Sequence, residues 1–98
     1  MKIREIKQIA NGRQPRPYAD HIYEWVIDIE GQPTKEEVLE FCHTYLERAP
    51  LERTEYLTKY RSNLPFNEHM QVVCGGWYTL EVRDYCKWVY HVQREYID

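Results

Sequence analysis

The stretch that decides the fold is residues 21–46, HIYEWVIDIEGQPTKEEVLEFCHTYL. In its first part every second side chain is large and apolar: Tyr23, Trp25, Ile27 and Ile29. The positions between them mix apolar and acidic side chains: Ile22, Glu24, Val26 and Asp28. Because successive side chains of a strand point to opposite faces, this alternation predicts a strand over 21–29 with one face in the core and the other partly in water.

The second part of the stretch predicts a helix from about Lys35 to about Arg48. Thr34 and Glu37 have the spacing of a capping box, in which the threonine hydroxyl accepts a hydrogen bond from the Glu37 amide and the glutamate reaches back. Early acidic residues also suit the positive end of the helix dipole. Apolar residues then recur at helical spacing: Val38, Leu39, Cys42, Tyr45 and Leu46.

The residues before this stretch predict a second strand and a loop. Residues 2–9 favour a strand, but Ile3, Ile6 and Ile9 recur every third position, which indicates a β-bulge or an edge strand. Residues 10–19 predict a loop, since Asn11-Gly12 is a turn dipeptide and two prolines follow.

The residues after the stretch are less regular. Pro50 suits the first turn of a second helix, which we expect to end near Ser62. Residues 69–74 predict a strand, with a tight turn at Gly75-Gly76 and a hairpin partner over 77–82. Residues 82–96 fit either a helix or a strand that alternates through Trp88, Tyr90 and Val92, and the helical spacing is slightly favoured.

The chain has 98 residues, which fits one domain over residues 1–98. The elements predict the α+β class, with a small antiparallel sheet packed on one face by two or three helices. Residues 2–9, 20–29 and 69–82 supply the sheet, and the helix at 35–48 covers it.

Composition indicates a soluble, cytoplasmic protein. Hydrophobic residues make up 43% and charged residues 30%, as in globular domains. No apolar run approaches the roughly 20 residues that span a bilayer, and the first residues lack the apolar core of a signal peptide. The lack of such a run predicts no membrane association. Three cysteines form no disulfide framework, which favours free thiols in a reducing compartment.

No catalytic, metal or cofactor site is expected. His69, Cys74, Cys86 and His91 lack the close pairs that zinc sites use. Cys42 and His43 are adjacent on a helix and therefore point about 100° apart. Gly75-Gly76 lacks the spacing of a phosphate loop. The protein is therefore interpreted as not an enzyme, and a small enzyme with an unrecognised site is the third hypothesis.

The leading hypothesis is a non-enzymatic protein-binding module or inhibitor that acts through an aromatic and acidic surface. Residues 17–55 carry a net charge of −7, and aromatic residues make up 14% of the chain. The candidate partner-binding residues are Tyr18, Glu36, Glu37, Glu40, Trp77 and Tyr78. Self-association into a homodimer through an edge strand is part of this hypothesis. Size, acidity and aromatic content also look like those of many small accessory proteins of phages and mobile elements, a likeness that locates no residue.

The second hypothesis is a nucleic-acid-associated protein that uses the basic N-terminal strand and loop. Its candidate residues are Lys2, Arg4, Arg13 and Arg16, within a segment of net charge +4 over residues 1–16. The whole chain carries a net charge of −3, which is unlike a typical nucleic-acid-binding domain. Nucleic acid is therefore disfavoured as a partner.

Overall fold

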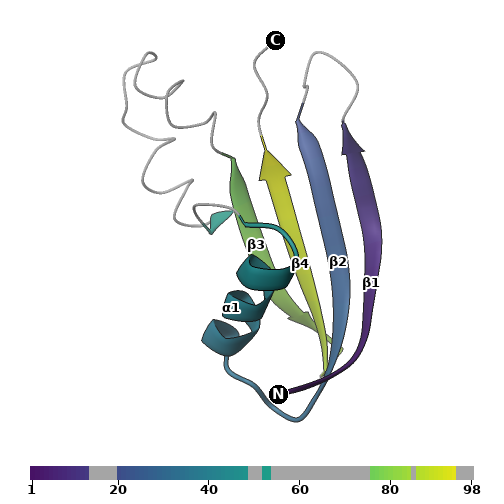
Figure 1. Cartoon of the computed structure of the whole chain (residues 1–98), viewed down its shortest axis with the longest axis vertical. Coiled ribbons are helices and arrows are strands. Elements are labelled where there is room, and N and C mark those ends of the chain that lie inside the picture. The colour runs from purple at the N-terminus through teal and green to yellow at the C-terminus, as the bar shows by residue number, and fades with distance from the viewer. Residues whose placement is uncertain (14–19, 49–51, 54–75, 85, 95–98) are drawn as a thin grey trace.

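The computed structural model describes residues 1–13, 20–48, 52–53, 76–84 and 86–94. Its elements, in chain order, are β1 (Lys2–Arg13), β2 (His21–Glu30), α1 (Lys35–Tyr45), β3 (Trp77–Arg83) and β4 (Lys87–Arg94). The four strands form one antiparallel sheet in the order β1-β2-β4-β3 (Figure 1). The α+β class and the small antiparallel sheet are confirmed. The prediction of two or three helices is wrong for the described residues, which hold α1 alone, and the helix expected over 50–62 lies almost wholly outside them.

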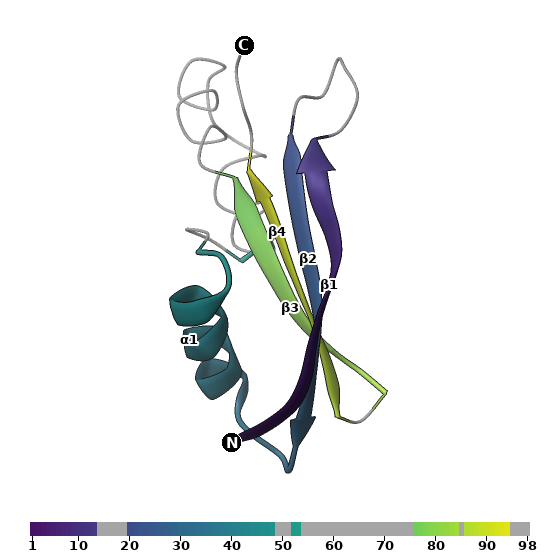
Figure 2. The same cartoon turned by 45° about the vertical axis from the view of Figure 1, so that its right-hand side comes forward.

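Helix α1 packs on one face of the sheet, beside β3 and β4 (Figures 1 and 2). No helix or strand of the described residues covers the opposite face, which we call the open face. Val38 and Cys42 of α1 are fully buried against this face. They join a core that β2, β3 and β4 supply: Trp25, Ile27, Ile29, Tyr78, Leu80, Trp88, Tyr90 and Val92. Each buried aliphatic or aromatic side chain contributes about 1.5–3 kcal/mol, so this contact holds α1 on the sheet.

Strand β1 is an edge strand with two irregularities, as its three-residue spacing predicted. Its pairing with β2 shifts register between Ile3 and Glu5 and again between Gln8 and Ala10. Because of the first shift, Ile3 and Ile6 lie opposite Ile29 and Ile27, and therefore share one face although they are three residues apart.

Of the loop expected over 10–19, residues 10–13 belong to β1, and residues 14–19 lie outside the described residues. Asn11 and Gly12 remain in β1, where they lie opposite Tyr23 and Ile22 of β2. The turn propensity of this dipeptide is thus overridden by pairing with a long neighbouring strand, and the predicted turn at Asn11-Gly12 is wrong.

The preference for a helix over 82–96 is also wrong, because residues 87–94 form β4 at the centre of the sheet. Trp88, Tyr90 and Val92 all point into the core at strand spacing. The turn into β4 has no glycine or proline, and Asp84 takes the left-handed conformation there with φ of 50°. Aspartate is one of the few residues that tolerates this region.

Gly76, the second glycine of the predicted Gly75-Gly76 turn, lies at a close approach of two backbones. It precedes β3 with φ of 81°, and a Cβ atom there would lie 2.0 Å from the carbonyl oxygen of Gln93. The close approach of the two backbones therefore requires glycine at this position. The strand expected over 69–74 and the first glycine of the pair lie outside the described residues.

Candidate functional site

The candidate site is the solvent side of α1. The predicted cap is confirmed: Thr34 Oγ1 accepts a hydrogen bond of 3.2 Å from the Glu37 amide. The helix therefore begins at Lys35, which places Glu36, Glu37 and Glu40 on its exposed side. The three acids of the predicted surface are thus exposed and lie on one helix.

Two exposed apolar side chains lie next to these acids. Tyr45 is 72% exposed and Met1 is 57% exposed, and the Tyr45 ring contacts Phe41 at a centroid distance of 5.1 Å. Met1, Phe41 and Tyr45 line one open depression together with Glu37, Glu40 and Thr44. We call these six residues the α1 surface. By its spacing, Tyr45 was predicted to lie on the apolar side of the helix with the buried residues. Its exposure shows that this prediction is wrong.

A second depression lies on the other flank of α1. It shares Glu40 and Thr44 with the α1 surface, and its other lining residues are Glu36, Leu39, His43 and Arg48. The ring of His43 packs edge-on against Tyr78 at 4.8 Å. Its Nε2 atom is buried and has no hydrogen-bond partner in the described structure. Burial, and to a smaller extent the Arg48 charge, lowers the pKa of His43 and favours the neutral ring.

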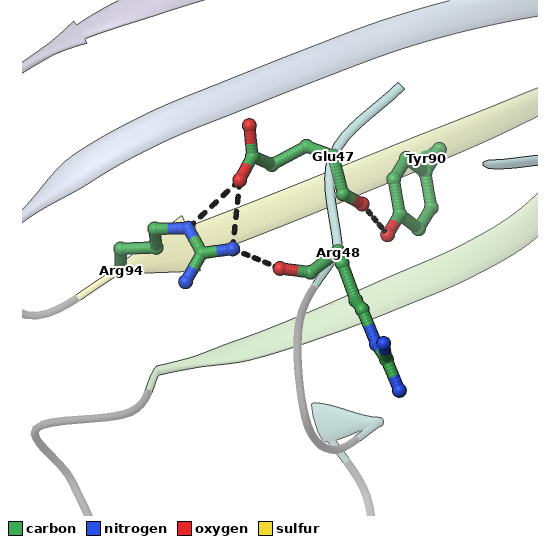
Figure 3. Close-up of polar contacts among 4 residues, drawn as sticks. All are labelled: Glu47, Arg48, Tyr90 and Arg94. Carbon is green, nitrogen blue, oxygen red and sulfur yellow. Dashed lines mark hydrogen bonds and ion pairs between the residues drawn. The ribbon is translucent and has the colours of Figure 1, made fainter. Parts of the chain in front are cut away.

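The C-terminal end of α1 is held to β4 by side chains of the strand (Figure 3). Arg94 donates to Glu47 Oε1 through Nε at 3.0 Å and through Nη2 at 2.7 Å. It also donates to the Arg48 carbonyl, and the Tyr90 hydroxyl donates to the Glu47 carbonyl. Burial raises the pKa of Tyr90, so the hydroxyl keeps the proton that it donates. These bonds fix the end of the helix, and thereby the orientation of the α1 surface.

The predicted aromatic residues do not join the acids. Tyr78 is 7% exposed and belongs to the core, so its assignment to an exposed binding surface is wrong. Trp77 precedes Tyr78 in the same strand and therefore points to the opposite, open face, where it pairs with Gln93. Tyr18 lies outside the described residues. Phe41 and Tyr45 take the place of these aromatics, and their i, i+4 spacing on an already predicted helix was the available signal.

The open face of the sheet carries a polar chain between β2 and β4 that the sequence did not reveal. Glu24 Oε2 lies 2.8 Å from His91 Nδ1, and His91 Nε2 lies 3.2 Å from Gln93 Oε1. Gln93 Nε2 donates to Asp20 at 2.7 Å. Both ring nitrogens of His91 thus lie within hydrogen-bond distance of a neighbouring side chain, and the contact with Glu24 ties β4 to β2.

The basic residues of the nucleic-acid hypothesis lie along β1, and two of them are ion-paired with β2. Lys2 lies 3.5 Å from Glu30, and Arg4 donates to Asp28 at 3.1 and 2.8 Å. The hydrogen bonds from Arg4 also lower the pKa of Asp28. Arg13 is exposed at the end of β1, and Arg16 lies outside the described residues. The charge available to a phosphate backbone is therefore smaller than the sequence implied.

The described cysteines offer no reactive thiol pair. Cys42 is fully buried, and burial raises its pKa to about 12, which keeps the thiol protonated. Within the described ranges, no group of three or more His, Cys, Asp and Glu residues could hold a metal ion. His69 and Cys74 of the rejected zinc set lie outside those ranges.

Comparison with known proteins yields no relative: no family model, curated protein or solved structure matches the chain. Of the residues that the structure describes, no helix has the length and apolar character needed to cross a membrane.

Proposed function

We propose that this protein is a non-enzymatic protein-binding module or inhibitor that contacts its partner through the α1 surface. The observation that carries the proposal is the depression in which Met1 and Tyr45 lie exposed beside Glu37 and Glu40. The partner that fits this chemistry is a protein with a basic surface that presents an apolar side chain.

Each component of the α1 surface has a separate role in such a contact. Exposed tyrosines are favoured anchors of protein interfaces, because one rigid ring buries a large area at low entropic cost. The acidic side chains around it steer a basic partner and reject an acidic one. Both roles need exposure, and Glu37, Glu40 and Tyr45 of the α1 surface are all exposed, as is the preceding acid of the helix, Glu36.

The bonds at the end of α1 support the proposal further. Because Arg94 and Tyr90 hold the residues that follow the helix, α1 presents its side chains from a fixed support. A preorganised surface loses less conformational freedom on binding, which favours affinity.

The test is affinity capture from a lysate of the source cell with three forms of the full chain. The first is the wild type, and the second is the triple variant E36Q/E37Q/E40Q, which keeps a side chain at Glu37 that can cap the helix. The matched control is E30Q/E81Q/D84N, which removes three exposed charges from the sheet and its turn. Both triple variants carry a net charge of 0 in place of −3.

We expect wild type and control to capture the same protein, and the helix variant to lose it. Y45A should lose it as well, and added salt should weaken capture by wild type. Equal capture by the two triple variants would show that the acids of α1 do not contact the partner. Circular dichroism and a thermal melt of each variant check that the fold is kept.

A further inference from the structure

We propose that β1 pairs with β1 of a second copy of this chain, forming an antiparallel dimer with its two-fold axis at Ile6. This inference uses the edge of the sheet and is independent of the α1 surface. It starts from the position of β1, which is bonded to β2 on one side and lies at the edge of the sheet on the other (Figure 1).

Strand β1 is unusually long and exposed for an edge strand. It has 12 residues, against a typical length of about 5–6, and all of them except Ile3 and Ala10 are exposed. Its outer backbone N–H and C=O groups are a template for another strand. Ile6 is 40% exposed along this edge, which is apolar surface that a second strand would cover.

The two bulges restrict where a second strand can pair. Glu5, Ile6, Lys7 and Gln8 lie opposite four consecutive residues of β2, without a register shift. Bulges bend the strand on either side and discourage further pairing. Pairing with β2 is regular over two windows of β1, Glu5–Gln8 and Ala10–Arg13. The second window contains no acidic residue and therefore cannot form an opposite-charge pair with its own copy, so we centre the dimer in Glu5–Gln8.

Antiparallel geometry leaves four registers in this window. Residues that face each other across an antiparallel ladder both direct their backbone groups toward the partner or both direct them away. Two neighbouring residues of one strand direct their backbone groups to opposite edges. A residue of one copy therefore cannot face the residue that is next in number in the other copy. The two-fold axis must consequently pass through a residue, which is Glu5, Ile6, Lys7 or Gln8.

Charge selects Ile6 among the four. An axis at Glu5 or at Lys7 brings that charge opposite its own copy, which is destabilising. An axis at Gln8 brings Lys7 opposite Ile9 and forms no ion pair. An axis at Ile6 brings the two Ile6 side chains together and places Glu5 opposite Lys7 of the partner subunit, once on each side of the axis. This register alone has two opposite-charge pairs and no like-charge pair in the window.

The register also fixes the orientation of the two copies. Residues that face each other in a ladder lie on the same face of the sheet, so the sheets of both copies join with both α1 helices on the same side. Since the regular window is short, we expect a weak dimer, with a Kd on the order of 10–1000 µM.

The first test is disulfide trapping of the full chain under mild oxidation. In the Ile6 register the two copies of residue 6 have Cα atoms about 4.5–5.5 Å apart, within the range that a disulfide spans. I6C should therefore form a covalent dimer in high yield. Q8C is the matched control, because it lies on the same face of β1 but opposite residue 4. Wild type controls for the native cysteines. Equal trapping of I6C and Q8C, or trapping of neither, would overturn the register.

The second test is sedimentation equilibrium of reduced protein from about 10 µM to 1 mM, the range of the expected Kd. Each of E5K and K7E should raise the Kd roughly tenfold, because two opposite-charge pairs become like-charge pairs. The double variant E5K/K7E re-creates both pairs in reversed order and should restore the wild-type Kd. A monomeric wild type across this range, or a double variant as weak as the single variants, would refute the proposal.

Stability measurements separate these outcomes from misfolding. Glu5 lies opposite Asp28 within the chain, so E5K removes a like-charge contact and should not lower the melting temperature. A variant that melts as wild type does but fails to dimerise has lost the interface and kept the fold.

Discussion

The two faces of the sheet hold the same strands together by different means. Under α1, β2 and β4 place Ile27, Trp88 and Tyr90 in a closed apolar layer. On the open face the same strands place Val26, Glu24 and His91, which are half-buried and partly polar. The covered face thus supplies most of the stability. The open face adds hydrogen bonds and ion pairs, which contribute less because water can replace them when they are lost.

The largest expected effect comes from breaking the covered face at β2. Ile27 is fully buried, and I27A should lower the free energy of unfolding by about 3 kcal/mol, through lost burial and the cavity that remains. Its neighbour Val26 points to the open face, so V26A should cost about 1 kcal/mol or less. Urea unfolding of both variants measures the difference. Equal losses would show that the open face is as well packed as the covered one.

A smaller effect is expected where the covered face holds the end of α1. Y90F keeps the buried ring but removes the hydroxyl that donates to the Glu47 carbonyl, and should cost about 1 kcal/mol. Amide hydrogen exchange in the last turn of α1 should accelerate with it. T79V, a change of the same kind on the open face, should stay within about 0.5 kcal/mol of wild type. If T79V is as destabilising as Y90F, a hydroxyl group on the open face contributes as much to the free energy of unfolding as the Tyr90 hydroxyl does.

The features that the sequence predicted correctly are those that depend only on residues within a single strand or helix. The alternation of β2 and the Thr34–Glu37 cap depend on residues that are close in the chain, and the structure has both. The irregular spacing of β1 likewise revealed its bulges. The exposed acids of α1 followed directly from the helix, because charged side chains rarely face a core.

The failed predictions concern features that neighbouring elements decide. Residues 87–94 fit two periods, and pairing with β2 and β3 selects the strand. Tyr78 and Tyr45 are both tyrosines at plausible core positions, yet one is 7% and the other 72% exposed. Which ring is buried depends on where α1 lies over the sheet, and no local pattern encodes that position. The i, i+4 spacing of Phe41 and Tyr45 could show that the two rings are neighbours, but it could not show that Tyr45 is exposed, whereas the exposure of the acids could be predicted.

The smallest expected effect is a pH dependence at the border between α1 and the covered face. Burial lowers the pKa of His43 in the folded protein, so the unfolded chain binds a proton at higher pH than the folded chain does. Stability is therefore fully present above the ordinary histidine pKa of about 6.5 and falls as the pH drops toward the lower, folded value. H43F removes this titration and keeps a ring against Tyr78, while all carboxylates remain common to both proteins. The stability of H43F relative to wild type, measured by urea unfolding between pH 7.5 and pH 5, should rise on acidification. A constant difference would mean that His43 takes up its proton equally well in the folded and unfolded chains, and that the covered face does not exclude charge at this position.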